Sequence, residues 1–374
     1  LAGDFSYKFL VDFGGANGDE TYQAYFKSTT GGGFTSTGAG TGPHIKEAWV
    51  GYKGILDPFT FKVGAMPTPT NLADTTNSDD LLFNERPSPA QLERGLAADD
   101  GRDSVGFIGN GDWWNASAFL TGDTYGKADL VPPGSGQEAI VARAAVAPFY
   151  DPATNFNVHL GGNVQDVIHP QEATSCTLGG SCSTVPGISL SDRPELRVDN
   201  VTFLKTPTIA ATGAQVYGLE GAASWGPLLV QAENFWYDIE RVPTKGESNP
   251  NFSGWYVEGS WVITGEFHQY NMATASYTRP NPDSPVGEGG FGAWEVAGRY
   301  SSTDLEYHTG LADAVYGGKQ NILSTGINWY PINAVKVMFD YDIVSLQDIG
   351  GLTGPRTDDN GHFTDLSTRV QVSF

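Results

Sequence analysis

The stretch AVKVMFDYDIV, residues 334–344, alternates in character at almost every step. One row of side chains is apolar, and the row between them carries the charges. The apolar row is Val335, Val337, Phe339, Tyr341 and Ile343, and the charged residues of the other row are Lys336, Asp340 and Asp342. Successive side chains of a β-strand point to opposite faces of the sheet. The stretch therefore predicts a strand with one oily face and one wet face.

The same alternation recurs along the whole chain. FSYKFLVDF (5–13), NFNVHLGGNVQ (155–165), GAWEVAGRYS (292–301) and STRVQVSF (367–374) each place apolar and polar residues in separate rows. A soluble β-sandwich would also show such rows, with the polar row as its surface. The alternation predicts an all-β fold, and other features must decide what the oily face touches.

Aromatic residues and connection lengths decide in favour of a membrane. The aromatic residues close to predicted turns are Trp225, Trp236, Trp255, Trp261, Trp329 and Tyr330. Tyr and Trp gather at strand ends where a barrel crosses the two membrane–water interfaces. Short connections such as 57–58, 151–152 and 226–227 mostly alternate with long polar ones such as 27–44, 166–193 and 345–363. Short turns opposite long loops are typical of an outer-membrane barrel.

The sequence therefore predicts a single-domain transmembrane antiparallel β-barrel over residues 1–374, in the bacterial outer membrane with its lipid and lipopolysaccharide. No stretch reaches the 18 or more apolar residues of a membrane helix, whereas a barrel strand crosses with about 9 to 11 residues. About fourteen strands are visible, at 4–13, 45–53, 58–66, 104–110, 114–122, 139–147, 154–166, 212–225, 228–240, 254–265, 292–302, 320–330, 333–344 and 364–374. The terminal Phe374 is expected to face lipid at the periplasmic rim and to serve as the assembly signal of the barrel.

Composition and motifs exclude several other functions. A net charge of −22 would repel the phosphates of nucleic acid. Cys176 and Cys182, in SCTLGGSC, favour a disulfide over a metal site because no His or second Cys pair is near. No His-x-x-x-His pair or Gly-x-Ser-x-Gly elbow occurs, so no enzyme, cofactor or catalytic metal is expected. The acidic stretches NSDD and AADDGRD leave calcium open, although neither has the spacing of a calcium-binding loop.

The chain also resembles a known family. The stretches that carry the likeness are LAGDFSYKFLVDF, HIKEAWVGYKG, FTFKVGAM, QLERG followed by DSVGF, VYGLEGAASWGPLLVQAENF, GWYVEGSWVITGE, GAWEVAGRYSSTDL and GINWYPINAVKVMFDYDIV. Their order makes the chain similar to the phosphate- and polyphosphate-selective porins (porin O/P) of Gram-negative outer membranes. The resemblance implies a homotrimer of sixteen-stranded barrels, each with an inward-folded third loop. The chain starts inside a turn that follows two strands in the family, so sixteen strands are expected if that pair precedes it.

Two positions depart from the pattern of this family. Ala65 stands where the pattern often has a basic residue, and Lys46 stands where it is often acidic. The anion-selective members line their pore with many Arg and Lys, and this chain is poor in both. Phosphate selectivity therefore does not follow from the resemblance.

The inward constriction loop corresponds to residues 66–103. Its acidic residues are Asp74, Asp79, Asp80, Glu85, Glu93, Asp99, Asp100 and Asp103, and its basic residues are Arg86, Arg94 and Arg102. This excess of five negative charges lies in a narrow low-dielectric pore, which focuses the field of its charges. The loop predicts a preference for cations or neutral solutes, unless its carboxylates face bulk solvent or cap turns instead.

Strand alternation assigns the charged residues of the wall to the lumen. The candidate pore-lining set is Lys8, Lys62, Arg143, Glu295, Arg299, Lys336, Asp340, Asp342 and Arg369 of the wall, with Asp79, Asp80, Glu85, Arg86, Glu93, Arg94 and Arg102 of the loop. Glu220, Glu233 and Glu258 share the same face. Water solvates charges in a lumen, whereas Lys or Arg at the lipid midplane costs about 2–4 kcal/mol. The plainer alternative is a solvated wall without selectivity.

The predicted function is a porin for passive diffusion of small hydrophilic solutes and ions. The family suggests phosphate-type anions, and the lumen charge indicates weak or cation-leaning selectivity. One alternative is a soluble or surface all-β carbohydrate-binding protein. Another is an oligosaccharide channel whose tryptophans stack sugars, although most of these tryptophans fall in the oily row.

Overall fold

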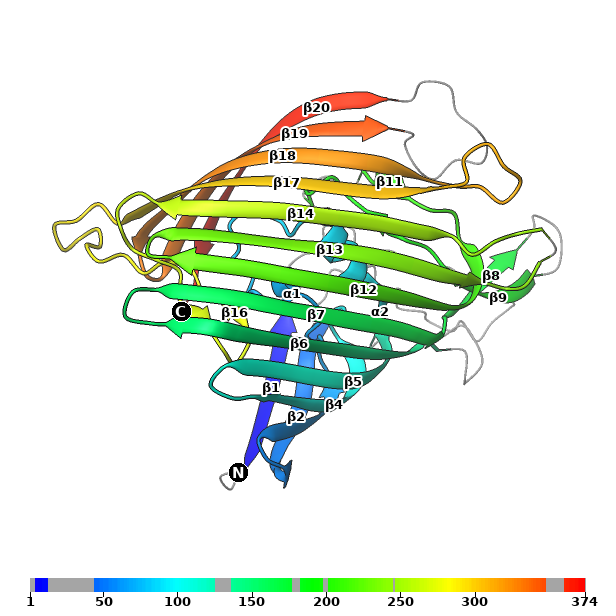
Figure 1. Ribbon diagram of the computed structural model, residues 1–374, viewed down its shortest axis with the longest axis horizontal. Helices are drawn as coiled ribbons and strands as arrows, with labels where there is room; N and C mark the ends of the chain where they lie inside the picture. The colour runs from blue at the N-terminus through cyan, green and yellow to red at the C-terminus, as the bar shows by residue number, and fades with distance from the viewer. Residues whose placement is uncertain are drawn as a thin grey trace, which may run out of the picture.

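The computed structural model describes residues 4–12, 44–124, 136–176, 182–197, 201–244, 246–347 and 360–373. Fourteen strands follow one another in a curved antiparallel sheet, from β1 to β20 (Figure 1). They are β1 (Phe5–Asp12), β2 (His44–Leu56), β3 (Phe59–Ala65), β4 (Arg102–Asn110), β5 (Trp114–Thr124), β6 (Glu138–Asp151), β7 (Phe156–His169), β12 (Ile209–Trp225), β13 (Leu228–Arg241), β14 (Asn251–Val262), β17 (Ala293–Tyr307), β18 (Val315–Ile332), β19 (Val335–Gln347) and β20 (Gly361–Val372). The fourteen predicted strands are thus confirmed.

A hairpin adds two strands to this sheet. β8 (Glu172–Cys176) pairs with β9 (Cys182–Ile188), and the end of β9 pairs with the start of β12. These two strands belong to the connection between β7 and β12, so they are not the N-terminal pair expected from the family. The backbone register sets Cys176 opposite Cys182, and the disulfide between them stays a prediction.

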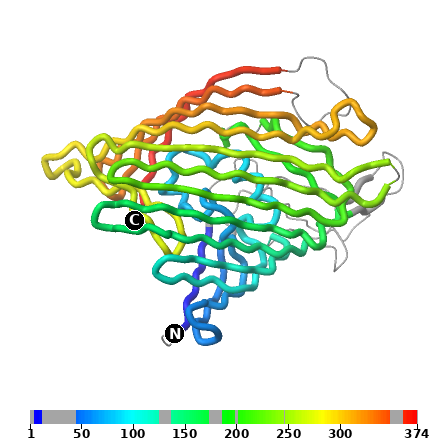
Figure 2. The backbone as a smooth tube through the Cα atoms, viewed as in Figure 1, coloured from blue at the N-terminus to red at the C-terminus, as the bar shows by residue number. Residues whose placement is uncertain are grey.

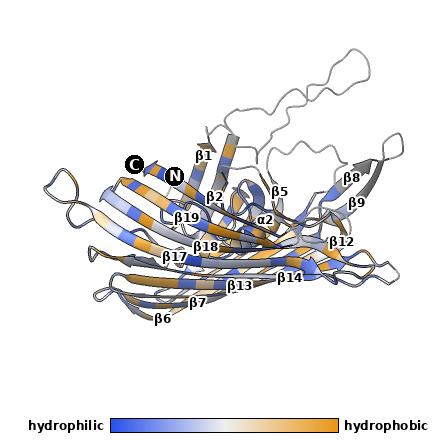
Figure 3. Ribbon diagram, turned by 90° about the horizontal axis from the view of Figure 1, so that it is seen from above, coloured by the Kyte–Doolittle hydropathy of each residue, from blue (hydrophilic) through white to orange (hydrophobic). Residues whose placement is uncertain are grey.

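The two rows of each strand occupy different environments. On β19, Phe339 is 45% exposed on the outer surface, while its neighbour Asp340 is 2% exposed on the inner one. Figure 3 shows hydrophilic and hydrophobic segments alternating along the strands. Of the aromatic residues expected at strand ends, Trp225 is 72% exposed. Tyr330 is the exception: it is buried on the inward row of β18 with Asn328, where its hydroxyl donates a hydrogen bond to Glu295.

Connections of different length gather at opposite ends of the strands (Figure 2). Turns of a few residues join β2 to β3, β4 to β5, β12 to β13 and β18 to β19 at one end. One connection at this end, residues 263–292, is long and carries β15 (Tyr270–Asn271) and β16 (Ser276–Tyr277). The sequence did not predict this long connection among the short turns.

The constriction loop occupies residues 66–101, between β3 and β4. Arg102 and Asp103, which were assigned to this loop from the sequence, belong to β4, and Asp103 is exposed on the outer side. The loop contains α1 (Leu72–Thr75) and α2 (Ser88–Ala97) on the concave side of the sheet (Figure 1). Asn71 caps α1 because its side chain accepts a hydrogen bond from the Asp74 N–H.

A packed core lies inside the sheet rather than on its outer surface. Ala90, Leu92 and Leu96 of α2 pack with inward residues of the wall such as Phe235 and Tyr237. The segment after β9 contains β10 (Ser191–Asp192) and β11 (Leu204–Lys205), and it contributes Leu190 and Leu204 to this core. No helix among the described residues is long and apolar enough to cross a membrane.

Candidate functional site

The lumen is the candidate site, and the constriction loop is fastened to one side of it. The Tyr237 hydroxyl donates to the Pro89 carbonyl at 2.5 Å, and the Asn328 amide donates to the Leu82 carbonyl at 2.9 Å. Lys336 donates to the Leu81 carbonyl. These wall residues stand on β13, β18 and β19. Toward β2, the loop forms an ion pair of 3.1 Å between Asp100 and Lys46.

Two buried carboxylates hold the start of the constriction loop. Glu233 of β13 accepts the backbone N–H groups of Leu72 and Ala73 at 2.8 and 3.0 Å. These are N–H groups of the first turn of α1, which have no partner within the helix. Glu93 accepts hydrogen bonds from Thr70 and from the Asn71 amide. Burial raises the pKa of Glu93 to about 7.

Arg94 pairs with three acidic side chains at the base of this loop. Its guanidinium contacts Asp74 at 2.6 Å, Asp100 at 2.5 Å and also Asp99. Arg94 itself is buried. The count along the loop already includes Arg94; its negative charge is reduced further only by Lys46 and Arg197, which lie outside the loop and pair with Asp100 and Glu85.

The other charged residues predicted for the loop are also engaged. Arg86 donates to the carbonyls of Ala73, Asp74 and Thr76. Glu85 lies 3.4 Å from Arg197. Asp79 and Asp80 accept hydrogen bonds from Ser373 and from the Arg279 backbone, respectively. Arg102 donates to carbonyls, among them that of Leu96 at 3.1 Å, and to the Gln137 side chain.

A second segment, around β10, folds into the lumen from the loop end. Glu195 accepts hydrogen bonds from the Ser88 backbone at 2.8 Å and from the Ser301 hydroxyl at 2.6 Å, and it pairs with Arg299. Glu195 holds a positive φ of 55°, a backbone conformation that non-glycine residues seldom adopt. Asp192 accepts from the Ser88 hydroxyl, and burial raises its pKa to about 7. The sequence analysis missed Glu195, whose role depends entirely on contacts distant in sequence.

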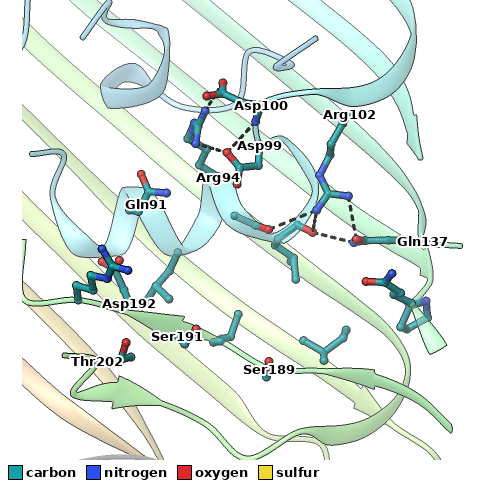
Figure 4. A pocket seen from close by; sticks show the side chains of 18 of the residues that line it. Gln91, Arg94, Asp99, Asp100, Arg102, Gln137, Ser189, Ser191, Asp192 and Thr202 are labelled. Atoms are coloured by element: carbon teal, nitrogen blue, oxygen red, sulfur yellow. Dashed lines mark hydrogen bonds and ion pairs between the residues drawn. The ribbon is translucent and has the colours of Figure 1, made fainter. Parts of the chain in front are cut away.

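A cavity of about 450 Å³ lies between α2 and this second segment. Its lining includes both signs of charge, from Arg94, Arg102, Asp99, Asp100 and Asp192. Figure 4 shows Arg94 turned toward Asp99 and Asp100, with Arg102 turned toward Gln137 at the other side. The arginines of this cavity are committed to protein partners.

The long connection 263–292 enters the lumen from the turn end. Arg143 of β6 donates to the carbonyls of Thr274 and Ala275 at 2.9 and 3.0 Å. The same guanidinium makes two contacts with Glu220, at 2.8 and 3.0 Å. The Tyr270 hydroxyl lies 2.7 Å from the ring of His159. The unusual length of this connection was the one signal in the sequence that could have revealed it.

The wall residues predicted to face the lumen do so, but most are buried rather than solvated. Those nine-tenths or more buried are Arg143, Glu220, Glu233, Glu258, Glu295, Arg299, Lys336, Asp340 and Asp342. Glu295 accepts from His268 of the 263–292 connection at 2.5 Å. Arg369 donates to the Asn84 carbonyl at 3.3 Å. The charges of the wall therefore bind the inward segments as well as facing water.

One group of wall residues is more open. Lys8 pairs with Glu47 at 2.6 Å, and its side chain is 49% exposed. The Lys62 ammonium lies 4.1 Å from the centre of the Trp49 ring, a cation–π contact. These residues stand on β1 to β3.

Three other acidic residues have neither an ion pair nor a full set of hydrogen-bond donors among the described residues. Asp340 and Asp342 of β19 and Asp365 of β20 face the lumen. Within the described ranges they form no ion pair with Lys, Arg or His. Arg299, which lies in the same cross-strand row as Asp342, contacts Glu195 and Glu258 instead.

An outer surface of apolar strands around charged inward segments defines a β-barrel channel protein of the bacterial outer membrane. The chain belongs to the family of phosphate-selective porins O and P, whose model matches residues 1–374. Membership removes support for the soluble carbohydrate-binding alternative.

The individual relatives share less than a third of their residues with this chain over the aligned regions. Porin O of Pseudomonas aeruginosa is 24% identical over 387 residues, covering 98% of this chain and 81% of that protein. An uncharacterized protein of Caulobacter vibrioides is 29% identical over 192 residues, which are 51% of this chain and 36% of that protein. Among solved structures, OmpT of Vibrio cholerae and its loop L8 deletion mutant give TM-scores of 0.47 and 0.48. Each is 11% identical and covers 88% of this chain and 81% of the other.

Phe374, the expected assembly signal, lies outside the described residues. In the part of the chain that the structure describes, no three His, Cys, Asp or Glu side chains are grouped so that they could hold a metal ion.

Proposed function

We propose that this porin admits small hydrophilic solutes by passive diffusion and prefers cations to anions. One observation carries the preference: the arginines facing the lumen are engaged by protein partners, whereas three lumen carboxylates have no cationic partner. Arg94, Arg143 and Arg299 each pair with at least one buried acid. Asp342 and Asp365 have no such partner among the described residues.

The passage itself is narrow. The constriction loop fastens to β13, β18 and β19, and the segments around β10 and β15–β16 enter from the two ends. A lumen filled in this way excludes large solutes and brings small ones close to charged walls, where a low-dielectric surrounding strengthens electrostatic interactions.

Lys62 argues in the opposite direction. It faces the lumen beside Trp49 with no carboxylate of the described residues in ion-pair contact, and Glu47 is already paired with Lys8. Lys62 on β3, Lys336 on β19 and Arg369 on β20 form no ion pair with a carboxylate among the described residues, so their charges offset those of the three aspartates. The excess of acidic over basic residues in the constriction loop then tips the balance toward cations, although only weakly.

The reversal potential of wild-type channels in planar bilayers tests this proposal. With a KCl gradient across the bilayer, a potential with the sign of potassium permeation supports it. A potential with the sign of chloride permeation would overturn the cation preference and favour the anion selectivity suggested by the family name.

The resemblance also supports a homotrimer in contact with outer-membrane lipid and lipopolysaccharide. Cross-linking of the protein in native outer membranes tests this part. A band at three times the subunit mass is expected, and a monomer alone would contradict it.

A further inference from the structure

Three aspartates lie side by side on the lumen face of β19 and β20. Asp342 and Asp365 stand opposite each other in the antiparallel register. Asp340 is two residues from Asp342 on the same strand, so both share one face. Asp340 and Asp342 are 2% and 4% exposed. Asp340, Asp342 and Asp365 are called the aspartate cluster below.

The carboxylates of this cluster are largely unsatisfied. Asp340 accepts one hydrogen bond, from the Asn84 backbone at 2.7 Å. Its other oxygen, one oxygen of Asp342 and both oxygens of Asp365 are buried without a hydrogen-bond partner among the described residues. The side-chain oxygen of Asn84 is buried and unpartnered as well.

The positive groups of the same wall are used elsewhere. Arg299 contacts Glu195 and Glu258, and Lys336 donates to the Leu81 carbonyl. Arg369 donates to the Asn84 carbonyl at 3.3 Å. None of these cations forms an ion pair with the aspartate cluster in the described chain.

Without a bound cation, the carboxylates of the aspartate cluster repel each other and lack cationic partners among the described residues. Like charges directly opposite each other weaken a strand pair, and buried charges in proteins are normally paired with an opposite charge or with hydrogen-bond donors. Elsewhere in this lumen, buried acids have partners, as Glu220 has Arg143 and Glu233 has two N–H groups. The exception at β19 and β20 points to positive charge supplied by a molecule in the lumen.

The spacing of the oxygens indicates the chemical class of that molecule. A bare metal ion needs several oxygens within about 2.0–2.6 Å of one point. No group of three acidic or other metal-binding side chains in the described residues could provide this. Asp340 and Asp342 are instead separated by about 7 Å along the strand. An ammonium group, with three N–H donors, or a guanidinium group, with five, can reach such separated acceptors.

We propose that the aspartate cluster, with the Asn84 side-chain oxygen, is a binding subsite for solutes that carry an ammonium or guanidinium group. This inference rests on the proposed cation preference and names a solute class for it. The solute would bind while it crosses the lumen, and its N–H groups would take the places of the missing hydrogen-bond donors.

Channel block by two organic cations tests the subsite. Potassium current through single channels in planar bilayers is measured while n-butylammonium or tetramethylammonium is added. Both carry one positive charge, but only n-butylammonium has N–H donors. The half-blocking concentration of n-butylammonium is expected to be about tenfold lower, because a hydrogen bond to a charged group contributes about 1.5–3 kcal/mol. Equal half-blocking concentrations, or no block, would overturn the subsite.

A double variant tests whether the block by n-butylammonium occurs at the aspartate cluster. Asp342→Asn with Asp365→Asn is expected to raise the half-blocking concentration of n-butylammonium by about tenfold. Asp103→Asn, which removes an exposed acid from the outer side of β4, is the matched control and should leave it unchanged. An unchanged value in the double variant would contradict the assignment. If that variant fails to fold, the comparison of the two cations on the wild-type channel still decides.

The reversal potential on the same bilayers separates the two proposals. A potential with the sign of chloride permeation contradicts the cation preference. A potential with the sign of potassium permeation, together with no difference between the two blockers, contradicts the aspartate cluster alone.

Discussion

Two charged pairs on the inner wall of the barrel show how differently one face can use its charges. On β6 and β12, Arg143 and Glu220 carry opposite charges, contact each other twice and hold the 263–292 connection. On β19 and β20, Asp342 and Asp365 carry the same charge and contact no cation in the described residues. The first pair fastens an inward segment, and the second leaves charge for a solute. Facing the lumen is therefore not enough to make a residue part of the permeation path.

The largest effect is expected from breaking the opposite-charge pair. Glu220→Ala would leave Arg143 buried without its acid, at a cost of about 3–5 kcal/mol in the free energy of unfolding. Urea titration of the protein in lipid vesicles measures this loss. Glu240→Ala, at an exposed acid on β13, is the control and should stay near wild type. Similar stabilities for the two variants would show that the pair does not hold the fold.

A somewhat smaller loss of stability is expected from a charged substitution on the lipid-facing side of β19. Phe339→Arg places a charge on the lipid-facing surface, where Arg at the midplane costs about 2–4 kcal/mol. Asp238→Arg makes a charged substitution on the same outer surface near the end of β13, where the cost is about 0–1 kcal/mol. The yield of folded protein in vesicles compares them. If Phe339→Arg folds as well as Asp238→Arg, the oily row does not contact lipid.

Glu93 is an intermediate case, because it is buried without a cation but has hydrogen-bond donors. Its pKa in the folded chain is about 7, above the ordinary value of 4.5, so the folded protein binds the extra proton between these values. Its contribution to stability is complete below pH 4.5 and is lost as the pH rises to 7, by about 3 kcal/mol at most.

Glu93→Gln tests this pH dependence. The free energy of unfolding of wild type relative to this variant, measured between pH 4 and pH 8, is expected to fall with rising pH. A constant difference across that range would contradict a proton held by Glu93.

The smallest change in stability is expected at the like-charge pair. Asp342→Asn with Asp365→Asn removes the repulsion between facing carboxylates, which amounts to about 0.2–1 kcal/mol in a strand pair. The variant should be as stable as wild type or slightly more stable in the same urea titration. A loss of several kcal/mol would mean that the cluster has a structural partner, and the comparison with Arg143 and Glu220 would fail.

The sequence predicted the wall well because alternation depends on local geometry. Side chains of residues such as Phe339 and Asp340 must point to opposite faces of any strand that contains them, so the facing of β19 was clear. Tyr330 also follows this rule, because it shares the inward row of β18 with Asn328, although its place near a turn had suggested the membrane interface. The face of the sheet to which a side chain points could thus be predicted, whereas the groups that surround it could not.

The lumen was predicted less well because its contents are set by contacts between distant segments. Lys336 was expected in water, but it is buried against the Leu81 carbonyl, more than 250 residues away. The net charge of the constriction loop was counted correctly, yet Lys46 and Arg197 from outside the loop pair with two of its acids, Asp100 and Glu85. Glu195 and the 263–292 connection gave no local pattern from which their inward positions could be derived.

The reversal potential of the like-charge variant tests the central claim most directly. Wild type, Asp342→Asn with Asp365→Asn, and the control Asp103→Asn are compared in planar bilayers under the same KCl gradient. If uncompensated lumen carboxylates set the cation preference, the double variant should shift toward the chloride potential while the control matches wild type. An identical reversal potential in all three proteins would contradict the claim.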